Sequence, residues 1–314
     1  MPPVSTAPRT NPHSGTWPAV SDPRLGAAYS RAGRSLPAAA ALVAGLKPFP
    51  SAATELMTLL SNPETPMYRI RAAIERDPAF VTRLLHVANS AAYRPTRACC
   101  SIEEAVARLG SKNVFDIVVG VAALGTFDSL TKSGKRIRDH SVGVAAIARL
   151  LGVEWGGQAG AAFTCGLLHD IGKLLLLQVG EVNYDALPTE MLERADRSHL
   201  YELPLLGYDH ATLGCYVLEH WRLPDSVANV VLSHHDPDSS SRFATDERQC
   251  VTVVRAADQL EYALRQHPVA SDRALAEVAT ESAILRAGLG EGELRKLWPA
   301  FVSTNADLRR ALGC

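Results

Sequence analysis

Side chains able to bind metal ions or move protons recur through the middle of this 314-residue chain. The stretch TCGLLHDIGKLLLL, residues 164–177, sets His169, Asp170 and Lys173 in a segment that otherwise has the composition of a buried helix. Adjacent residues lie about 100° apart on a helix. His169 and Asp170 therefore converge on one point only if the helix ends or bends there, which Gly172 would permit.

Further histidines and carboxylates follow the same pattern at predicted helix ends or on neighbouring helices. They are His140, His210, His234, His235 and Asp258. Imidazole and carboxylate groups suit zinc, iron, manganese and nickel, and helical bundles build such centres from side chains on several helices. A two-ion centre also needs a bridging carboxylate and positions open to water, and it can then activate that water for attack on phosphorus. The pattern indicates one or two divalent ions.

Each of these residues also has an ordinary structural explanation. A buried His–Asp pair is often a hydrogen-bonded pair in the core. His210, His234 and His235 occur where residues commonly cap helices or face solvent, and Lys173 would reach solvent beside an empty site. A chain that binds no metal is therefore the alternative to the metal centre.

Helix signals dominate the chain. Asp77-Pro78 forms an N-cap and first-turn pair, Ser101 with Glu104 forms a capping box, and Gly110 closes that helix. Alternating β-branched runs bounded by hairpin turns are absent from the sequence. We therefore expect an all-α fold.

The expected architecture is a two-lobed helical bundle. Its predicted parts are a disordered proline-rich leader at 1–35, an N-terminal helical lobe at 36–130, a metal-capable lobe at 131–265 and a helical tail at 266–314. The polar segment 232–249 is predicted to be a loop between two helices.

Composition excludes several classes of protein. Lys and Arg total 32 against 33 Asp and Glu, so no strong charge draws the chain to nucleic acid or to an anionic membrane. The six cysteines lack CxxC spacing, which favours a reducing compartment and a cytoplasmic location. The apolar stretches 36–46 and 114–127 are too short to span a membrane. Residues 101–126 resemble a helix-turn-helix, but the second helix is too apolar to read bases, so DNA binding is the least favoured function.

Several motifs resemble known families. HDIGK at 169–173, between His140 and Asp258, resembles the HD superfamily of metal-dependent phosphohydrolases, and the additional histidines are similar to those of its HD-GYP branch, which cleaves cyclic dimeric guanylate. A longer resemblance, over residues 46–262, is to the HDOD family, the HD-related output domain of bacterial signalling proteins. It is carried by KPFPSAATELMTLL, IERDPAFVTRLLHVANSAAY, SIEEAVARLGSKNVFDIVVGVAALGTF, LLGYDHATLG and LSHHDP.

The resemblance implies a ligand set. His140, His169, Asp170 and Asp258 would hold one ion, and Asp170 would bridge to a second ion held by His210, His234 and His235. Lys173 would contact a phosphate oxygen. The chain departs from the HD-GYP branch at two places: DPDSSS replaces the glycine-rich GYP loop after His235, and Arg136 stands where that branch has a glutamate. Cleavage of a cyclic dinucleotide is therefore not expected.

HDOD proteins have mostly lost such ligands and are regarded as regulatory platforms, whereas this chain keeps a full set of candidate positions. The resemblance implies a bacterial signal-transduction protein that binds a signalling protein partner or a small phosphate-containing ligand. The alternative is an active metal-dependent phosphohydrolase or phosphodiesterase, with Asp170 and Lys173 as catalytic residues. The upstream signal and the oligomeric state are not predicted.

Overall fold

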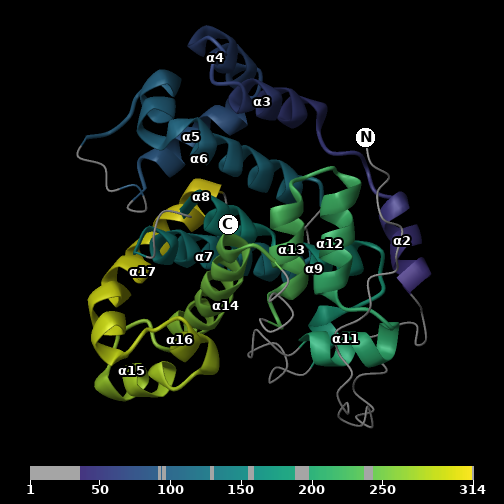
Figure 1. Cartoon of the computed structure of the whole chain (residues 1–314), viewed down its shortest axis with the longest axis vertical. Coiled ribbons are helices and arrows are strands. Elements are labelled where there is room, and N and C mark those ends of the chain that lie inside the picture. The colour runs from purple at the N-terminus through teal and green to yellow at the C-terminus, as the bar shows by residue number, and fades with distance from the viewer. Residues whose placement is uncertain are drawn as a thin grey trace.

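The regular structure of the protein is helical. The computed structural model describes residues 36–90, 93, 97–127, 131–154, 159–187, 198–236 and 243–312 (Figure 1). The predicted all-α fold is confirmed over these residues. The leader predicted at 1–35 lies outside them.

The helices are labelled as in Figure 1. They are α2 (Leu36–Ala44), α3 (Ser51–Ser61), α4 (Met67–Glu75), α5 (Pro78–Ala88), α6 (Ile102–Gly125), α7 (Lys132–Glu154), α8 (Ala159–Leu168), α9 (Ile171–Gln178), α11 (Ser198–Leu206), α12 (His210–His220), α13 (Asp225–Ser233), α14 (Thr245–Gln266), α15 (Asp272–Ala279), α16 (Ser282–Arg286) and α17 (Glu291–Leu312), with a 3₁₀ turn η2 at Tyr184–Ala186.

The first helices pack together as the sequence signals predict. The Asp77 side chain accepts hydrogen bonds from the first turn of α5, and Ser101 Oγ accepts one from the Glu104 N–H at 3.1 Å. Gly110, with φ of 76°, interrupts α6 and starts its second segment. That segment buries Val114 and most of its other apolar side chains, and α6 packs against α3, α5 and α8. These side chains are therefore not available to DNA bases.

The pair α7 and α8 forms the centre of the molecule (Figure 1). Every residue of α7 from Ser141 to Gly152 is buried. Gly166 allows close contact, because a Cβ there would lie 3.0 Å from the Cα of Ala145. Helix α14 packs on both α7 and α8, α6 covers another side of α8, and α9 packs against α12. The core thus joins all the segments that carry the candidate metal ligands.

The two ends of the described chain join this core. Helix α2 packs against α12, and α17 packs against both α7 and α5. The segment predicted as a helical tail at 266–314 contains α15, α16 and α17, and α17 is a single helix of 22 residues. Its acidic first turn and its Arg309 and Arg310 in the last turn complement the helix dipole.

The loop predicted at 232–249 is shorter than expected. Helix α14 already begins at Thr245, and its first turn contains Asp246 and Glu247. Acidic side chains stabilise the positive end of a helix dipole, which explains why this polar stretch is helical. The part at 237–242 lies outside the described residues.

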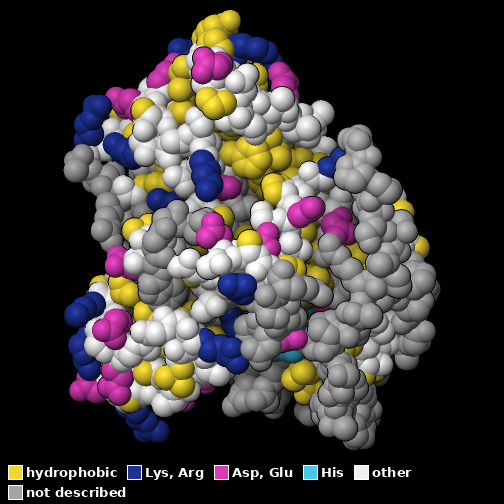
Figure 2. Space-filling model, viewed as in Figure 1, with side chains coloured by type: hydrophobic (Ala, Val, Ile, Leu, Met, Phe, Trp, Pro, Cys, Tyr) yellow, Lys and Arg dark blue, Asp and Glu magenta, His cyan; other side chains and the backbone are white. Residues whose placement is uncertain are grey.

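One segment, Ala159–Gln178, has the length and apolar composition of a membrane-crossing helix. In the fold it is divided into α8 and α9, and 89% of its apolar window is buried inside the protein. The segment is therefore part of the protein core. Figure 2 shows basic and acidic side chains interspersed over one face of the molecule, in agreement with the net charge of -1.

Candidate metal centre

The predicted buried helix around HDIGK is interrupted at its polar pair. Helix α8 ends at Leu168, α9 begins at Ile171, and His169 and Asp170 occupy the turn between them. The interruption lets both side chains face one space. Gly172 is not the cause of the turn, because it lies within α9, and a Cβ there would come 2.0 Å from the carbonyl oxygen of His210. It instead lets α12 approach α9.

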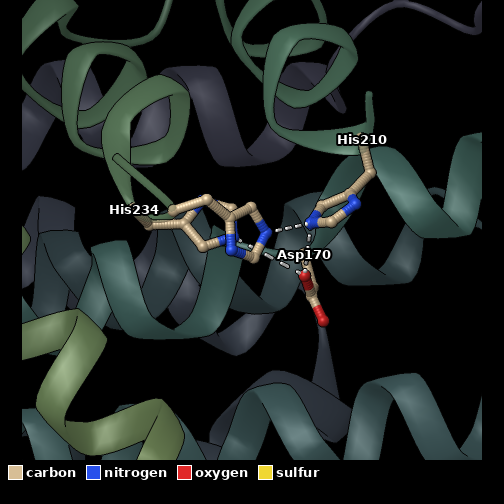
Figure 3. A group of neighbouring side chains, drawn as sticks. Asp170, His210 and His234 are labelled. Carbon is tan, nitrogen blue, oxygen red and sulfur yellow. Dashed lines mark hydrogen bonds and ion pairs between the residues drawn. The ribbon is translucent and has the colours of Figure 1, made fainter. Parts of the chain in front are cut away.

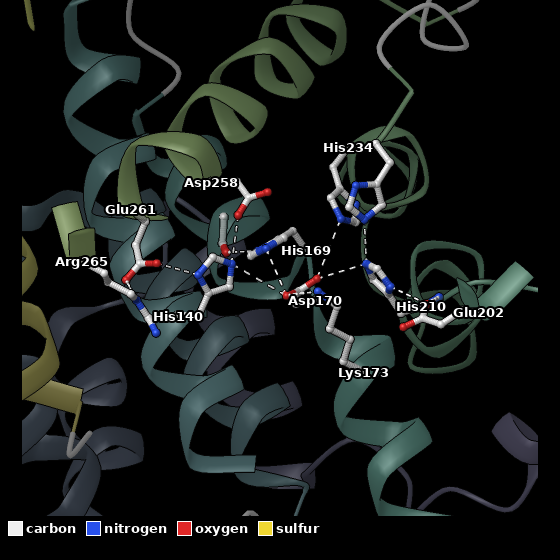
Figure 4. A network of polar contacts seen from close by, with 12 residues as sticks. His140, His169, Asp170, Lys173, Glu202, His210, His234, Asp258, Glu261 and Arg265 are labelled. Carbon is white, nitrogen blue, oxygen red and sulfur yellow. Dashed lines mark hydrogen bonds and ion pairs between the residues drawn. The ribbon is translucent and has the colours of Figure 1, made fainter. Parts of the chain in front are cut away.

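Two groups of side chains meet at Asp170, as Figure 4 shows, and Figure 3 shows the group that contains His210 and His234. On one side, Oδ2 lies 3.8 Å from His140 Nε2 and 3.5 Å from His169 Nε2. Asp258 Oδ1 completes this group at 3.0 Å from His140 Nε2. The ligand atoms of His140, His169 and Asp258 lie within 4.8 Å of one another.

The other oxygen of Asp170 faces a second group. Its Oδ1 lies 3.2 Å from His210 Nε2 and 3.9 Å from His234 Nε2. His235 joins this group through its Nε2, which lies 2.7 Å from His210 Nε2. The fold thus brings all seven predicted metal ligands to one place, with Asp170 between the two groups.

Lys173 lies at the same centre. Its Nζ donates a hydrogen bond of 2.8 Å to Asp170 Oδ2, and its side chain is 9% exposed. The lysine is therefore buried against the central carboxylate, and its charge offsets the charge of that group.

Glu261 and Glu202 form an outer ring that the sequence analysis missed. Nδ1 of His140 lies 2.7 Å from Glu261 Oε2, and Nδ1 of His210 lies 2.5 Å from Glu202 Oε2. Tyr184 donates to the other oxygen of Glu202 at 3.0 Å. Carboxylates in this position fix the orientation of a metal-binding imidazole and increase its basicity.

Backbone carbonyls perform the same task for two other histidines. His169 Nδ1 lies 2.8 Å from the Gly166 oxygen, and His234 Nδ1 lies 2.6 Å from the Val231 oxygen. A carbonyl only accepts, so Nδ1 carries the proton in both rings and the lone pair of Nε2 faces the centre.

The donor atoms fit divalent ions. Nε2 of His169 and Nε2 of His234 are buried and have no hydrogen-bond partner among the described residues. A buried polar atom without a partner costs about 1–3 kcal/mol, and ions coordinated by these lone pairs would remove that cost. Nitrogen and carboxylate ligands suit zinc, iron, manganese or nickel.

The charges of the site respond to burial and to these contacts. Burial lowers the pKa of His140, but Glu261 and Asp258 outweigh it and raise the pKa to about 9. His210 behaves in the same way beside Glu202, and its pKa also reaches about 9. Burial lowers the pKa of His234 and of His235 well below the usual value. Burial opposes ionisation of Asp170, but His169 and Lys173 hold its pKa well below the usual range.

Residues 46–237 match the HDOD domain family. The match covers more than half of the chain. The chain belongs to the HDOD family.

Several known proteins resemble this HDOD protein. An uncharacterised protein of Treponema pallidum is 29% identical over 189 residues, which cover 60% of this chain and 37% of that protein. Ribonuclease Y of Fervidobacterium nodosum is 28% identical over 170 residues, which cover 52% of this chain and 26% of the enzyme. The chain thus spans between 26% and 37% of the length of these curated relatives.

A solved structure has the same fold. It is a candidate phosphohydrolase of Shewanella amazonensis SB2B, with 22% sequence identity and a TM-score of 0.65, and the similarity covers 86% of this chain and 96% of that one. At this identity the similarity establishes the fold.

The HDOD match ends before the last predicted ligand. Asp258 and Glu261 lie on α14, beyond residue 237. They are three residues apart and therefore share one face of a helix, a signal from which Glu261 could have been inferred. Glu202, on α11, offered no comparable signal because its relation to His210 depends on the turn between α11 and α12.

Proposed function

We propose that this HDOD protein is a bacterial, cytoplasmic signal-transduction regulator whose HD site holds two divalent metal ions. It acts by binding a signalling partner or a small phosphate-containing ligand. The observation that carries the proposal is the position of Asp170, whose Oδ2 and Oδ1 face different groups of histidines. One carboxylate between two such groups is the arrangement that a two-ion centre requires.

The residues divide into two sets of ligands. His140, His169 and Asp258 would hold one ion, and His210, His234 and His235 would hold the other, with Asp170 shared. When bound, the ions supply positive charge and Lewis acidity toward a phosphate group. The side chains that define the centre are almost completely buried, with His140 the most exposed of those in ion pairs at 12%. Such burial favours ions that stay bound.

A regulatory effect could reach other surfaces through the helices that hold the ligands. Helix α8 ends at Leu168, directly before His169, and packs against α6. Helix α14 carries Asp258 and packs against α7, α8 and α13. If ions or a ligand in the centre favour one packing of these helices, they shift the protein toward the conformation with that packing. A partner that recognises a surface of that conformation would then bind more tightly.

Metal analysis tests the proposal. We expect about two ions per chain after purification without chelators, and a loss of at least one ion in Asp170→Asn. Glu277→Gln, which removes an exposed carboxylate on α15, is the control and should bind as many ions as the unchanged protein. Failure to bind zinc, iron, manganese or nickel, even after anaerobic reconstitution, would refute the metal centre.

Hydrolysis of a phosphate ester is the second candidate. It is favoured by Lys173, whose ammonium group lies 2.8 Å from Asp170 Oδ2 and could turn toward the charge that develops on phosphorus. A panel of nucleotide phosphates distinguishes the two functions. Metal-dependent turnover that Asp170→Ala abolishes would establish an enzyme, whereas metal-dependent binding without turnover would establish the regulatory module. Turnover unchanged by Asp170→Ala would belong to a contaminant.

A further inference from the structure

A cavity of about 850 Å³ lies apart from the metal centre. Its walls come from α3 and α6 on one side and from α8, α13 and the start of α14 on the other. Neither the seven candidate ligands nor Lys173 line it. We call it the Asp116 cavity. Figure 2 shows hydrophobic side chains gathered between the positions of α3 and α13, with acidic side chains beside them.

The Asp116 cavity has apolar walls and an excess of negative charge. Leu60, Phe115, Val119 and Val230 contribute to the apolar wall. The charged residues of the lining are Asp116, Asp246, Glu247 and Lys112, three acids against one base. A volume of this size accommodates a small molecule. The charge favours a cation and opposes a phosphate group.

Asp116 is the most buried of the charged residues that line the cavity. It is 9% exposed, and its Oδ2 makes no hydrogen bond of normal geometry within the described part of the chain. A Cβ on Gly160 would lie 2.2 Å from that oxygen, so the carboxylate packs directly against the backbone of α8 at this glycine. Burial raises the pKa of Asp116 to about 6, although Lys112, a hydrogen bond from the Thr164 side chain and Arg149 oppose the shift. The Asp116 carboxylate is thus largely ionised at neutral pH, and it accepts fewer hydrogen bonds than its two oxygens allow.

We propose that the Asp116 cavity binds a small organic ammonium ion, whose charged group pairs with Asp116 and whose apolar body packs against Phe115 and Val230. An ammonium group supplies a charged donor to the Asp116 carboxylate, whose side-chain hydrogen-bond partner is the neutral Thr164 hydroxyl, and the pair is partly desolvated. The site goes beyond the proposed function, because it takes a cation and lies outside the metal centre. Its occupant would contact α6 and α8 together.

The cavity and the metal centre share two helices. Helix α8 presents Thr164 and Cys165 to the cavity and ends at Leu168, directly before His169. Helix α14 presents Cys250 to the cavity and carries Asp258 further along. An ammonium ligand that fixes these helices would therefore act on the same elements that position both metal groups.

Calorimetric titration of the full chain tests the proposal with four matched probes. We expect n-hexylammonium to bind at least about tenfold more tightly than n-hexanol, since an ionic hydrogen bond contributes about 1.5–3 kcal/mol. Hexanoate and inorganic phosphate should show no binding at this site. Asp116→Asn should remove the preference for the amine over the alcohol. The control Glu277→Gln, which removes an exposed carboxylate on α15, should keep that preference.

A blocking variant locates the binding. Ser226 is exposed and lines the cavity, so Ser226→Trp should fold normally and fill the entrance. It should abolish hexylammonium binding while leaving the metal content unchanged. Equal affinity for hexylammonium and hexanol, retention of the preference in Asp116→Asn, or no saturable binding would each overturn the proposal. The metal analysis above is separate, so either proposal can fail alone.

The pH dependence gives a further readout. Alkylammonium ions remain protonated below about pH 9, so a change in affinity between about pH 7.5 and 5 reports the protein. The titratable and charged groups that interact with Asp116 are Lys112 on α6, Arg149 on α7, Cys165 on α8 and Tyr93. Asp246 and Glu247 of α14 line the same cavity. Protonation of Asp116, whose pKa is about 6, should weaken hexylammonium binding as the pH falls. Asp116→Asn should lack this step at about pH 6.

Discussion

At the scale of single residues, the hydrogen-bond partner of Nδ1 in four of the histidines determines how each ring presents its Nε2 to the centre. Glu261 accepts from His140 and Glu202 from His210, whereas His169 and His234 donate to backbone carbonyls. The carboxylate partners hold a proton on Nδ1 and leave Nε2 directed at the centre. The geometry is therefore set before any ion binds.

Glu261→Gln should lower metal affinity about 10- to 100-fold, because a neutral amide orients His140 less firmly and makes it a weaker base. Competition with a chromogenic chelator measures the change. Arg265→Gln is the matched control, since Arg265 contacts the opposite oxygen, Oε1, of Glu261. It should bind metal almost as tightly as the unchanged protein. Equal losses in both variants would indicate a general structural effect and contradict the role of Glu261.

At the scale of helices, small residues decide how closely the ligand-bearing elements approach. Gly172 on α9 allows contact with the backbone of α12, and Gly143 on α7 leaves room for Glu261, whose Cγ would lie 2.6 Å from an added Cβ. The first contact places His210 beside Asp170, and the second places Glu261 beside His140. The geometry of the site thus depends on how closely α9 approaches α12 and how closely α7 approaches α14.

Gly172→Ala should separate α9 from α12 and lower the free energy of unfolding by about 1–3 kcal/mol, the usual cost of overpacking. It should also weaken metal binding, because His210 moves with α12. Gly292→Ala is the control: it lies in α17 with open space around its Cα, and alanine there should be neutral or stabilising by up to about 1 kcal/mol. Chemical unfolding followed by circular dichroism measures both. If Gly172→Ala changed neither the free energy of unfolding nor metal binding, the close contact between α9 and α12 would not be required.

At the scale of the whole molecule, α17 connects segments far apart in the sequence. It packs on α5 and α7, and its Arg309 donates a hydrogen bond to Glu261, the residue that orients His140. The last helix therefore supports the metal centre from outside. Helix α17 thus joins the N-terminal helices to the helices that carry the candidate metal ligands.

Phe301→Ala should destabilise the protein by about 3–5 kcal/mol, because Phe301 is fully buried on α17. Metal should be released at a lower denaturant concentration, in step with the loss of helix. Val302→Ala, at the neighbouring position with 39% exposure, should change little. Metal release that stays at its original denaturant concentration in Phe301→Ala would show that α17 unfolds independently of the centre.

The sequence by itself determined the helical class, the caps at Asp77 and Ser101, and the residue types of the metal centre. These features depend on local spacing and on side-chain chemistry, both of which can be read along the chain. The break at His169 and Asp170 was also predictable, because adjacent residues on an uninterrupted helix cannot face one point.

Only the tertiary structure decided how those groups meet. The two sides of Asp170, the roles of Glu202 and Glu261, and the purpose of Gly172 depend on contacts between α9 and α12, α11 and α12, or α7 and α14. Such contacts join residues distant in the chain, and their geometry depends on packing in the core. The Asp116 cavity arises in the same way, because helices from both halves of the chain enclose it.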